Sequence, residues 1–261
     1  MTRHERLNAL LEYLAREGSL DVHDAAAALN VSTATIRRDL DHLAGQQMLT
    51  RTRGGAVAGG ISYDLPLRYK TARTATTKQR IGQAAAKLVG PGCTVGLNGG
   101  TTSTEVARAL ATRPDLCDAD GEPSVTVVTN AVNIANELTV RSHVKIVLTG
   151  GVARRQSYEL IGPLAAKILA ELTLDLAFIG VEAFDAELGA SARHEGEAAI
   201  NALMVSRAKQ VVVVTDSSKL GQRAFARICP VGEVHTLITD TDADDAALAP
   251  FREAGVQLIR A

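Results

Sequence analysis

The chain has 261 residues, 46% of them hydrophobic, and a formal net charge of −1 at pH 7. That is enough to bury the core of one large domain, or of a small and a medium one. Charges interrupt residues 1–17 and no apolar run approaches the ~18 residues of a membrane span, so we expect a cytoplasmic protein without a membrane partner. Three widely spaced cysteines, Cys93, Cys117 and Cys229, favour neither a disulfide framework nor a metal site.

The start of the chain has the pattern of a helix-turn-helix. Leucines recur at helical spacing at positions 7, 10, 11 and 14, and they predict an amphipathic helix that ends near Gly18. A second, short helix is predicted over 22–29. A tight turn follows, in which Ser32 is placed to cap a third helix over 33–43.

The third helix is predicted to have one apolar and one polar face. Ile36, Leu40 and Leu43 share one side at helical spacing, which leaves Arg37 and Arg38 on the other. Arginine pairs are more often simply exposed to solvent. Arginines on the second helix of such a motif, however, can bind guanine edges or phosphates.

Residues 48–57 alternate and turn on Gly54 and Gly55, as a β-hairpin does. Arg51 and Arg53 beside the turn are placed to bind phosphate. Between positions 51 and 80 the chain has seven basic residues and one acidic one. We therefore predict a winged helix-turn-helix domain over 1–57, with operator DNA as its partner, and a linker over 58–75.

From 76 to 261, apolar runs of strand length alternate with segments of helix length. The predicted strands are 93–97, 124–129, 144–149, 175–181, 210–215, 234–239 and 256–259. The fold class is thus α/β, with an N-terminal winged helix-turn-helix followed by a mostly parallel α/β sensor domain over 76–261. In such sheets ligands bind beyond the carboxyl ends of the strands.

The residues at those strand ends are polar or glycine. In LNGGTTSTEV, residues 97–106, a strand ends, two glycines turn and a helix begins among hydroxyls, which is the chemistry of an anion site. Asn130 suits sugar hydroxyls and Lys219 supplies positive charge. These groups predict a phosphorylated sugar as ligand. The candidate ligand-binding residues are Lys78, Asn98, Gly99, Gly100, Thr101, Thr102, Asn130, Gly150, Gly151 and Lys219.

VSTATIRRDLDHL followed by LTRTRGGA resembles the N-terminal signature of DeoR-family bacterial transcriptional regulators. GTT, VTNAVNIANEL, LTGG, DLAFIGV and TDSSKLG extend the resemblance over nearly the whole chain. It implies an effector domain that is similar to sugar-phosphate isomerases and senses phosphorylated sugars. The SYELIGPLA and HEGEA stretches resemble the amino-sugar branch, whereas Asn98 stands where the family usually has aspartate.

The resemblance also implies that Thr35 and Asp39 belong to the recognition helix, where Asp39 orients an arginine or caps the backbone. The candidate DNA-binding residues are Ser32, Thr33, Thr35, Arg37, Arg38, Arg51, Arg53, Gly54 and Gly55.

Three functions stay open. The favoured one is a homo-oligomeric regulator, a repressor of carbohydrate catabolism genes, whose operator binding responds to a phosphorylated sugar, with no cofactor, metal or catalytic residue. The second is an isomerase or deaminase of sugar phosphates, with an acid or base among Glu182, Asp185, His194 and Glu195. The third is a coregulator that no longer binds DNA, against which the arginines of the first domain argue. Neither GxGxxG nor GxxxxGK[ST] occurs, which disfavours a nucleotide enzyme.

Overall fold

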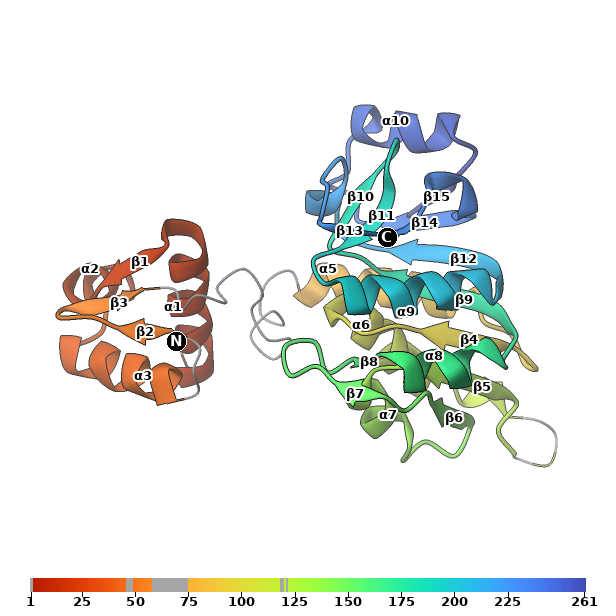
Figure 1. Cartoon of the computed structure of the whole chain (residues 1–261), viewed down its shortest axis with the longest axis horizontal. Helices are drawn as coiled ribbons and strands as arrows, with labels where there is room; N and C mark the ends of the chain where they lie inside the picture. Colours follow the sequence, from red (N-terminus) through yellow and green to blue (C-terminus); the bar gives the residue numbers. More distant parts are fainter. Residues whose placement is uncertain (1, 46–48, 58–74, 118–119, 121) are drawn as a thin grey trace. The chain divides into compact units, whose positions relative to one another are not determined.

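A computed structural model describes residues 2–45, 49–57, 75–117, 120 and 122–261 (Figure 1). The chain divides into two compact units, Met1–Arg73 and Thr74–Ala261, which we treat separately. The predicted linker, 58–75, lies outside the described residues except for position 75. No helix in the described part of the chain is both long and apolar enough to cross a membrane.

The N-terminal unit contains the predicted three helices and hairpin. Its strands form one antiparallel sheet in the order β1-β3-β2, and β1 was not predicted because its three residues are too short to show a period. The elements are α1 (Arg3–Glu17), β1 (Ser19–Asp21), α2 (Val22–Ala28), α3 (Thr33–Gly45), β2 (Thr50–Arg51) and β3 (Gly55–Val57).

Local capping explains where these helices begin and end. Thr2 and Glu5 form a capping box at the start of α1, and Gly18 ends the helix in the left-handed conformation (φ 73°). Asn30 ends α2 with a φ of 51°, a value that asparagine tolerates. The Ser32 Oγ accepts a hydrogen bond from the Thr35 amide at 3.2 Å, which confirms the predicted cap of α3.

The C-terminal unit is built on a seven-stranded sheet in the order β15-β14-β12-β9-β4-β5-β6, with every neighbouring pair parallel. All seven predicted strands belong to it. They are β4 (Thr94–Leu97), β5 (Val125–Thr129), β6 (Val144–Leu148), β9 (Leu174–Gly180), β12 (Ala208–Val214), β14 (Thr236–Thr239) and β15 (Gln257–Arg260).

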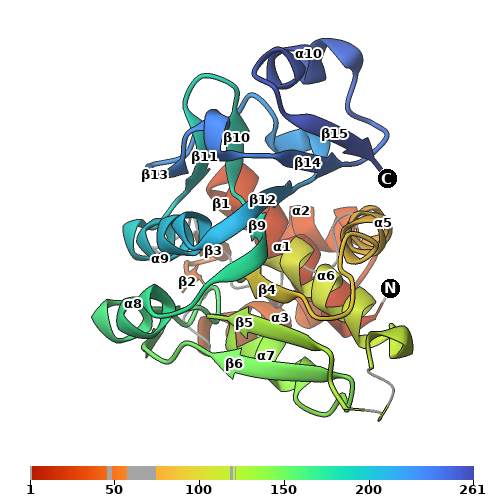
Figure 2. The same cartoon turned by 90° about the vertical axis from the view of Figure 1, so that its right-hand side faces the viewer.

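Helices cover both faces of this sheet. Figure 2 shows α5 and α6 on one side and α8 and α9 on the other. Strand β9 is buried on both faces: Leu176 and Phe178 pack into the core under α5 and α6. Ala177 and Ile179 pack into the core under α8 and α9. The helices are α5 (Ala75–Ala86), α6 (Thr101–Ala111), α7 (Val132–Leu138), α8 (Pro163–Ala170), α9 (Glu195–Ser206), α10 (Asp245–Glu253) and the 3₁₀ helices η1 (Pro114–Leu116), η2 (Ser217–Lys219) and η3 (Val231–Glu233).

Two small antiparallel sheets complete the unit, and the sequence did not predict either. They are β7 (Val152–Ala153) with β8 (Leu160–Ile161), and β10 (Ala183–Asp185) with β11 (Gly189–Ala192) and β13 (Ala226–Cys229). The first, a short hairpin, lies beside the carboxyl end of β5 through a bridge between Ala131 and Glu159.

The order of the strands fixes where a ligand would bind. From β4 the chain moves outward to β5 and β6, then returns to the other side of β4 for β9, β12, β14 and β15. The direction therefore reverses between β4 and β9. In open parallel sheets the crevice at such a reversal, beyond the carboxyl ends of the strands, is the usual ligand site.

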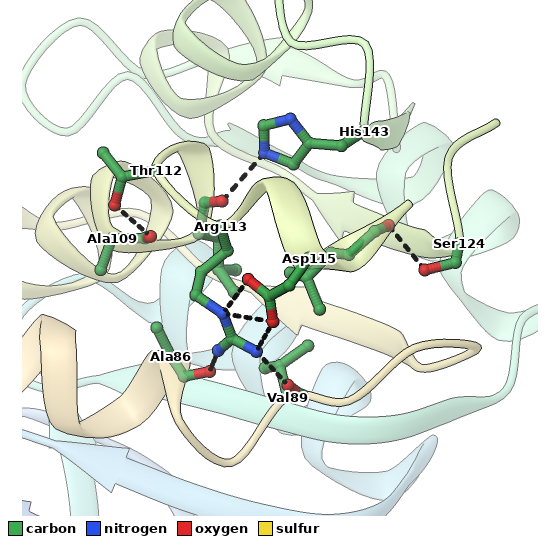
Figure 3. Close-up of polar contacts among 10 residues, drawn as sticks. Ala86, Val89, Ala109, Thr112, Arg113, Asp115, Ser124 and His143 are labelled. Carbon is green, nitrogen blue, oxygen red and sulfur yellow. Dashed lines mark hydrogen bonds and ion pairs between the residues drawn. The ribbon is translucent and has the colours of Figure 1, made fainter. Parts of the chain in front are cut away.

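At the amino end of the sheet, side-chain hydrogen bonds hold the ends of α5 and α6 (Figure 3). The Arg113 guanidinium donates to the Ala86 carbonyl at 2.6 Å, at the end of α5, and also binds Asp115. Its hydrogen bond to Asp115 lowers the pKa of that carboxyl. His143 Nε2 lies 3.1 Å from the Leu110 carbonyl near the end of α6. This end of the sheet fixes the ends of α5 and α6, which leaves the carboxyl end for a ligand.

Candidate functional site

The exposed face of α3 is the first candidate surface. Ile36, Leu40 and Leu43 are fully buried, whereas Arg37 and Arg38 are exposed, as the helical spacing predicted. Ser32 is exposed, and Thr33 and Thr35 are partly exposed at the start of the helix. This end of α3 therefore presents small hydroxyl residues followed by two arginines, a surface that can enter a major groove.

Asp39, in contrast, faces the interior. It is 2% exposed, and one carboxylate oxygen lies 2.5 Å from the Arg6 Nε of α1. The second oxygen lies 3.6 Å from the Arg3 Nε. Asp39 thus binds an arginine, as the resemblance implied, and through that contact it joins α1 to α3.

The hairpin divides into residues that support it and residues that project. Arg51 donates to Asp41 of α3 at 2.9 Å and to the Gly55 carbonyl at 2.6 Å, so it ties the hairpin to the recognition helix. Gly55 is buried, and a Cβ there would lie 1.8 Å from the Leu20 carbonyl oxygen. Arg53 and Gly54 are exposed. Among these candidates, Arg53 is the side chain best placed to reach a phosphate.

The second candidate site is the loop between β4 and α6. Asn98 is 1% exposed; its amide nitrogen donates to the Gly180 carbonyl, and its oxygen accepts from the Gly180 amide, both at 2.8 Å. The Ser103 hydroxyl donates to the same oxygen at 2.9 Å. These bonds use the Asn98 side-chain oxygen and one of its two N–H groups. Asn98 therefore holds the ends of β4 and β9 and the first turn of α6 together.

Gly100 is the N-cap of α6, with a φ of 116°, and as a glycine it has no side chain that could cap the helix. Thr101 follows and is partly exposed, whereas Thr102 is buried. A helix start of this kind carries amide donors and the positive end of the helix dipole, so it can receive an anion.

Glu159 contacts this loop, which the sequence did not predict. The Gly99 amide donates to the Glu159 Oε1 at 2.6 Å, and Glu159 is 3% exposed. The hairpin brings it there, because the Leu160 amide donates to the Asn130 carbonyl at 2.6 Å. A single glutamate before two apolar residues carries no local signal of this contact, which depends on how 152–161 folds back.

Glu159 is one of two buried carboxyl groups here. Glu197 of α9 is 8% exposed and accepts from Arg154 at 3.0 Å. Burial, and then the charge of Glu197, raise the pKa of Glu159 to about 8, against the opposing effects of the Gly99 amide, Arg154 and Asn130. The Asn130 side-chain oxygen is itself buried without a hydrogen-bond partner in the described part of the chain.

Two lysines lie near the same end of the sheet. Lys219, in η2 after β12, donates to the Val181 carbonyl at 2.5 Å, directly after β9. Lys78, in the first turn of α5, is 7% exposed and lies 3.9 Å from a carboxylate oxygen of Asp216. Lys219 thus follows β12, and Lys78 of α5 lies near Asp216, which also follows β12; β9 separates β12 from β4 in the sheet.

Gly150 and Gly151, after β6, have φ values of 69° and 119°. A Cβ at Gly151 would lie 2.8 Å from the Ile161 carbonyl oxygen and 2.9 Å from the Ala165 Cβ. The pair therefore serves the close packing of the hairpin and α8.

Of the four residues considered for an acid or base, Glu195 is exposed and the other three have structural contacts. Glu182 pairs with Arg193 at 3.1 Å, and His194 caps α9 by accepting from the Gly196 amide at 3.1 Å. Asp185 accepts from two backbone amides and from Arg223. In the described residues, no group of three or more histidine, cysteine, aspartate or glutamate residues could hold a metal ion.

A winged helix-turn-helix unit and a parallel α/β unit with a glycine-rich loop at the reversal of its strand order define a transcription regulator with a sensor domain. Comparison with known proteins agrees. The DeoR-like helix-turn-helix domain matches residues 6–59, and the DeoR C terminal sensor domain matches residues 73–241. The chain belongs to the DeoR family.

Curated relatives align along almost their whole length. The putative aga operon transcriptional repressor of Escherichia coli O157:H7 is 34% identical over 98% of this chain and 93% of its own. The HTH-type transcriptional regulator GlpR of Haloferax volcanii is 32% identical over 98% and 96%. The glycerol-3-phosphate regulon repressor of Escherichia coli K12 is 27% identical over 99% of both.

Among solved structures, ribose 5-phosphate isomerase A of Methanocaldococcus jannaschii has 20% identity and a TM-score of 0.40 over 56% of this chain and 54% of its own. A likeness at this level does not bear on activity. The named relatives, in contrast, are transcription regulators.

Proposed function

We propose that this protein is a cytoplasmic repressor of carbohydrate catabolism genes whose affinity for operator DNA is set by a phosphorylated sugar. The observation that carries the proposal is the glycine turn at the start of α6, at the reversal between β4 and β9, in a chain that also carries a winged helix. The names of two relatives, an aga operon repressor and a glycerol-3-phosphate regulon repressor, support it.

The phosphate is assigned to the start of α6. Gly100, Thr101 and Thr102 supply amides and hydroxyls, and Lys219 after β12 and Lys78 of α5 supply positive charge. The sugar hydroxyls are assigned to Asn130, whose buried side-chain oxygen has no partner in the described residues. Asn98, Gly150 and Gly151 support the site through the backbone contacts described above.

The sugar acts by linkage. A ligand changes DNA affinity only if it binds one state of the protein better than another, and such coupling is typically worth ~1–3 kcal/mol. We take release of DNA by the ligand as the direction, which makes the protein a repressor relieved by the sugar phosphate that its genes consume.

The test is a thermal-shift screen of the full chain against hexose phosphates, hexosamine phosphates, pentose phosphates and glycerol 3-phosphate. Any hit is then added to an operator-binding titration. A hit that changes operator affinity supports the proposal. A hit that is isomerised or deaminated, with no effect on DNA binding, would support the enzyme function instead.

Operator recognition is predicted to depend on different arginines in different ways. Alanine at Arg37 or Arg38 should cost ~1–3 kcal/mol and relax sequence preference at one base pair, because an arginine on α3 can read a guanine. Alanine at Arg53 should weaken all sequences alike and flatten the salt dependence, because a phosphate contact releases counterions. Fluorescence anisotropy at several salt concentrations, with operator and scrambled DNA, separates the two effects. Unchanged binding in all three variants would contradict the assignment of this surface.

We further propose a homo-oligomer joined through 76–261, because a single recognition module of this size buries only ~600–1,000 Å² and rarely reaches useful specificity. Operators should then contain repeated half-sites. Sedimentation of the full chain with DNA of one and of two half-sites measures this, and a monomer that binds one half-site tightly would contradict it.

A further inference from the structure

The Gly99 amide, which could donate a hydrogen bond to an anion at the β4–α6 loop, already has an acceptor. The Gly99 amide donates to Glu159 at 2.6 Å, and a Cβ at Gly99 would lie 2.4 Å from the Glu159 Cγ. The carboxyl group therefore lies directly against the loop, one residue before the start of α6. Any phosphate held at this helix start shares its surroundings with Glu159.

Lys78 and Lys219, which we assign to the phosphate, are not among the charged groups with the largest effects on Glu159. The charged groups that act on Glu159 are Glu197 of α9 and Arg154 after β7, while Gly99 and Asn130, from the loops after β4 and β5, contribute neutral hydrogen bonds. Arg154 is itself bound to Glu197 at 3.0 Å. One arginine thus serves two buried carboxyl groups, and a phosphate would bring further negative charge to the same place.

Resting on the function proposed above, we infer that Glu159 is a further residue of the effector site and that a phosphorylated effector binds together with one proton, held on the Glu159 carboxyl. An ionised Glu159 takes one proton from solvent when the phosphate dianion binds, and returns it when the ligand leaves. No covalent bond of the ligand is made or broken.

Two further observations support this role. The folded protein raises the pKa of Glu159 to about 8, mainly through burial, so uptake of a proton near neutral pH is inexpensive. The Asn130 oxygen is a buried acceptor without a partner in the described residues, so this part of the site can receive a further donor. A neutral carboxyl can also donate to a ligand oxygen, whereas a carboxylate can only accept. Glu159 thereby selects an effector whose anionic or hydroxyl oxygen faces it.

The experiment is a calorimetric titration of the full chain with glucose 6-phosphate and with inorganic phosphate from pH 7 to 9. Sugar phosphates are almost fully dianionic over this range, since the second phosphate pKa is about 6. If only the protonated form binds, affinity should fall about tenfold between pH 7 and pH 9. Titration in two buffers of different ionisation enthalpy should count close to one proton taken up at pH 9.

Glu159→Gln is the decisive variant, because glutamine keeps the size of the side chain and an oxygen for the Gly99 amide but cannot titrate. It should bind with nearly constant affinity from pH 7 to 9 and take up no proton. Glu253→Gln, at an exposed position in α10, is the matched control and should behave as the parent.

A ligand-free measurement guards against a misfolded variant. Because the folded pKa of Glu159 is raised above its ordinary value of 4.5, the folded state holds more protons, and the stability that Glu159 contributes is lost as pH rises through about 8. The midpoint temperature of thermal unfolding should therefore fall more steeply between pH 6 and 9 for the parent than for Glu159→Gln.

The outcomes separate the two proposals. Binding of either probe with the same pH dependence in parent and Glu159→Gln, or without proton uptake, overturns this inference and leaves the proposed function intact. Failure of glucose 6-phosphate and inorganic phosphate to bind at any pH, while other sugar phosphates also fail in the thermal-shift screen, overturns both.

Discussion

Gly55→Ala is expected to abolish operator binding. A Cβ at this position would lie 1.8 Å from the Leu20 carbonyl oxygen and 2.9 Å from its carbonyl carbon, both backbone atoms of β1. Neither atom can move aside as the end of a flexible side chain would, so the pairing of Asp21 with Gly55 must break. The hairpin that carries Arg53 then loses its support, and Arg51 loses the Gly55 carbonyl to which it donates.

We expect at least a hundredfold loss of operator affinity, about 2.7 kcal/mol, since the wing and part of the contact to α3 are disturbed together. Gly45→Ala is the matched control, because a Cβ at the end of α3 would meet no atom of the described residues within 4 Å. Anisotropy with operator DNA measures both variants, and circular dichroism checks that α1 to α3 remain helical. A Gly55→Ala variant that binds operator like the parent would show that the wing is dispensable.

The sequence predicted the elements whose signal is local. Four leucines at helical spacing, a serine at the start of α3 and seven apolar runs were enough for the N-terminal helices and the whole parallel sheet. Each of these signals is a property of neighbouring residues, because a helix or a buried strand imposes its own period on the chain. The short strands β1, β7 and β8 show no period and were missed, whereas β2 and β3 are equally short but were predicted from the alternation and the glycine turn of residues 48–57.

The candidate site was predictable in its position but not in its contacts. The polar residues after β4, β5 and β12 lie at one end of the sheet because parallel strands end together. Which atoms face a ligand depends on packing between distant segments. The Asn98 side chain is hydrogen-bonded to the backbone of Gly180. Glu159 is brought against Gly99 by a hairpin sixty residues further along the chain.

These contacts between distant segments change the expected effect of a mutation in the loop between β4 and α6. A substitution at Gly100 would not crowd the turn, because a Cβ there would meet no atom of the described residues within 4 Å. The obstacle at Gly100 is its φ of 116°, which L residues rarely adopt. A steric clash is expected instead at Gly99, where a Cβ would lie 2.4 Å from the Glu159 Cγ and 2.8 Å from its Cδ.

Gly99→Ala is therefore expected to abolish the response to the sugar phosphate while leaving operator binding intact. The added methyl group must displace the buried Glu159 side chain, which breaks the 2.6 Å hydrogen bond from the Gly99 amide and pushes the carboxyl group toward the start of α6. The displaced carboxyl group then no longer bonds the effector, and loss of such a hydrogen bond costs about 1.5–3 kcal/mol, so effector affinity should fall by about ten- to a hundredfold. None of the candidate DNA-binding residues lies in this unit.

Glu159→Ala tests the cause, because it removes the atoms that the new methyl group would strike. If the clash with Glu159 is responsible, Gly99→Ala should weaken effector binding much less in a Glu159→Ala background than in the parent. Calorimetry with the responding sugar phosphate on the parent, both single variants and the double variant gives this coupling directly. Equal losses in the two backgrounds would mean that Gly99 acts through its own backbone at the anion site, independently of Glu159.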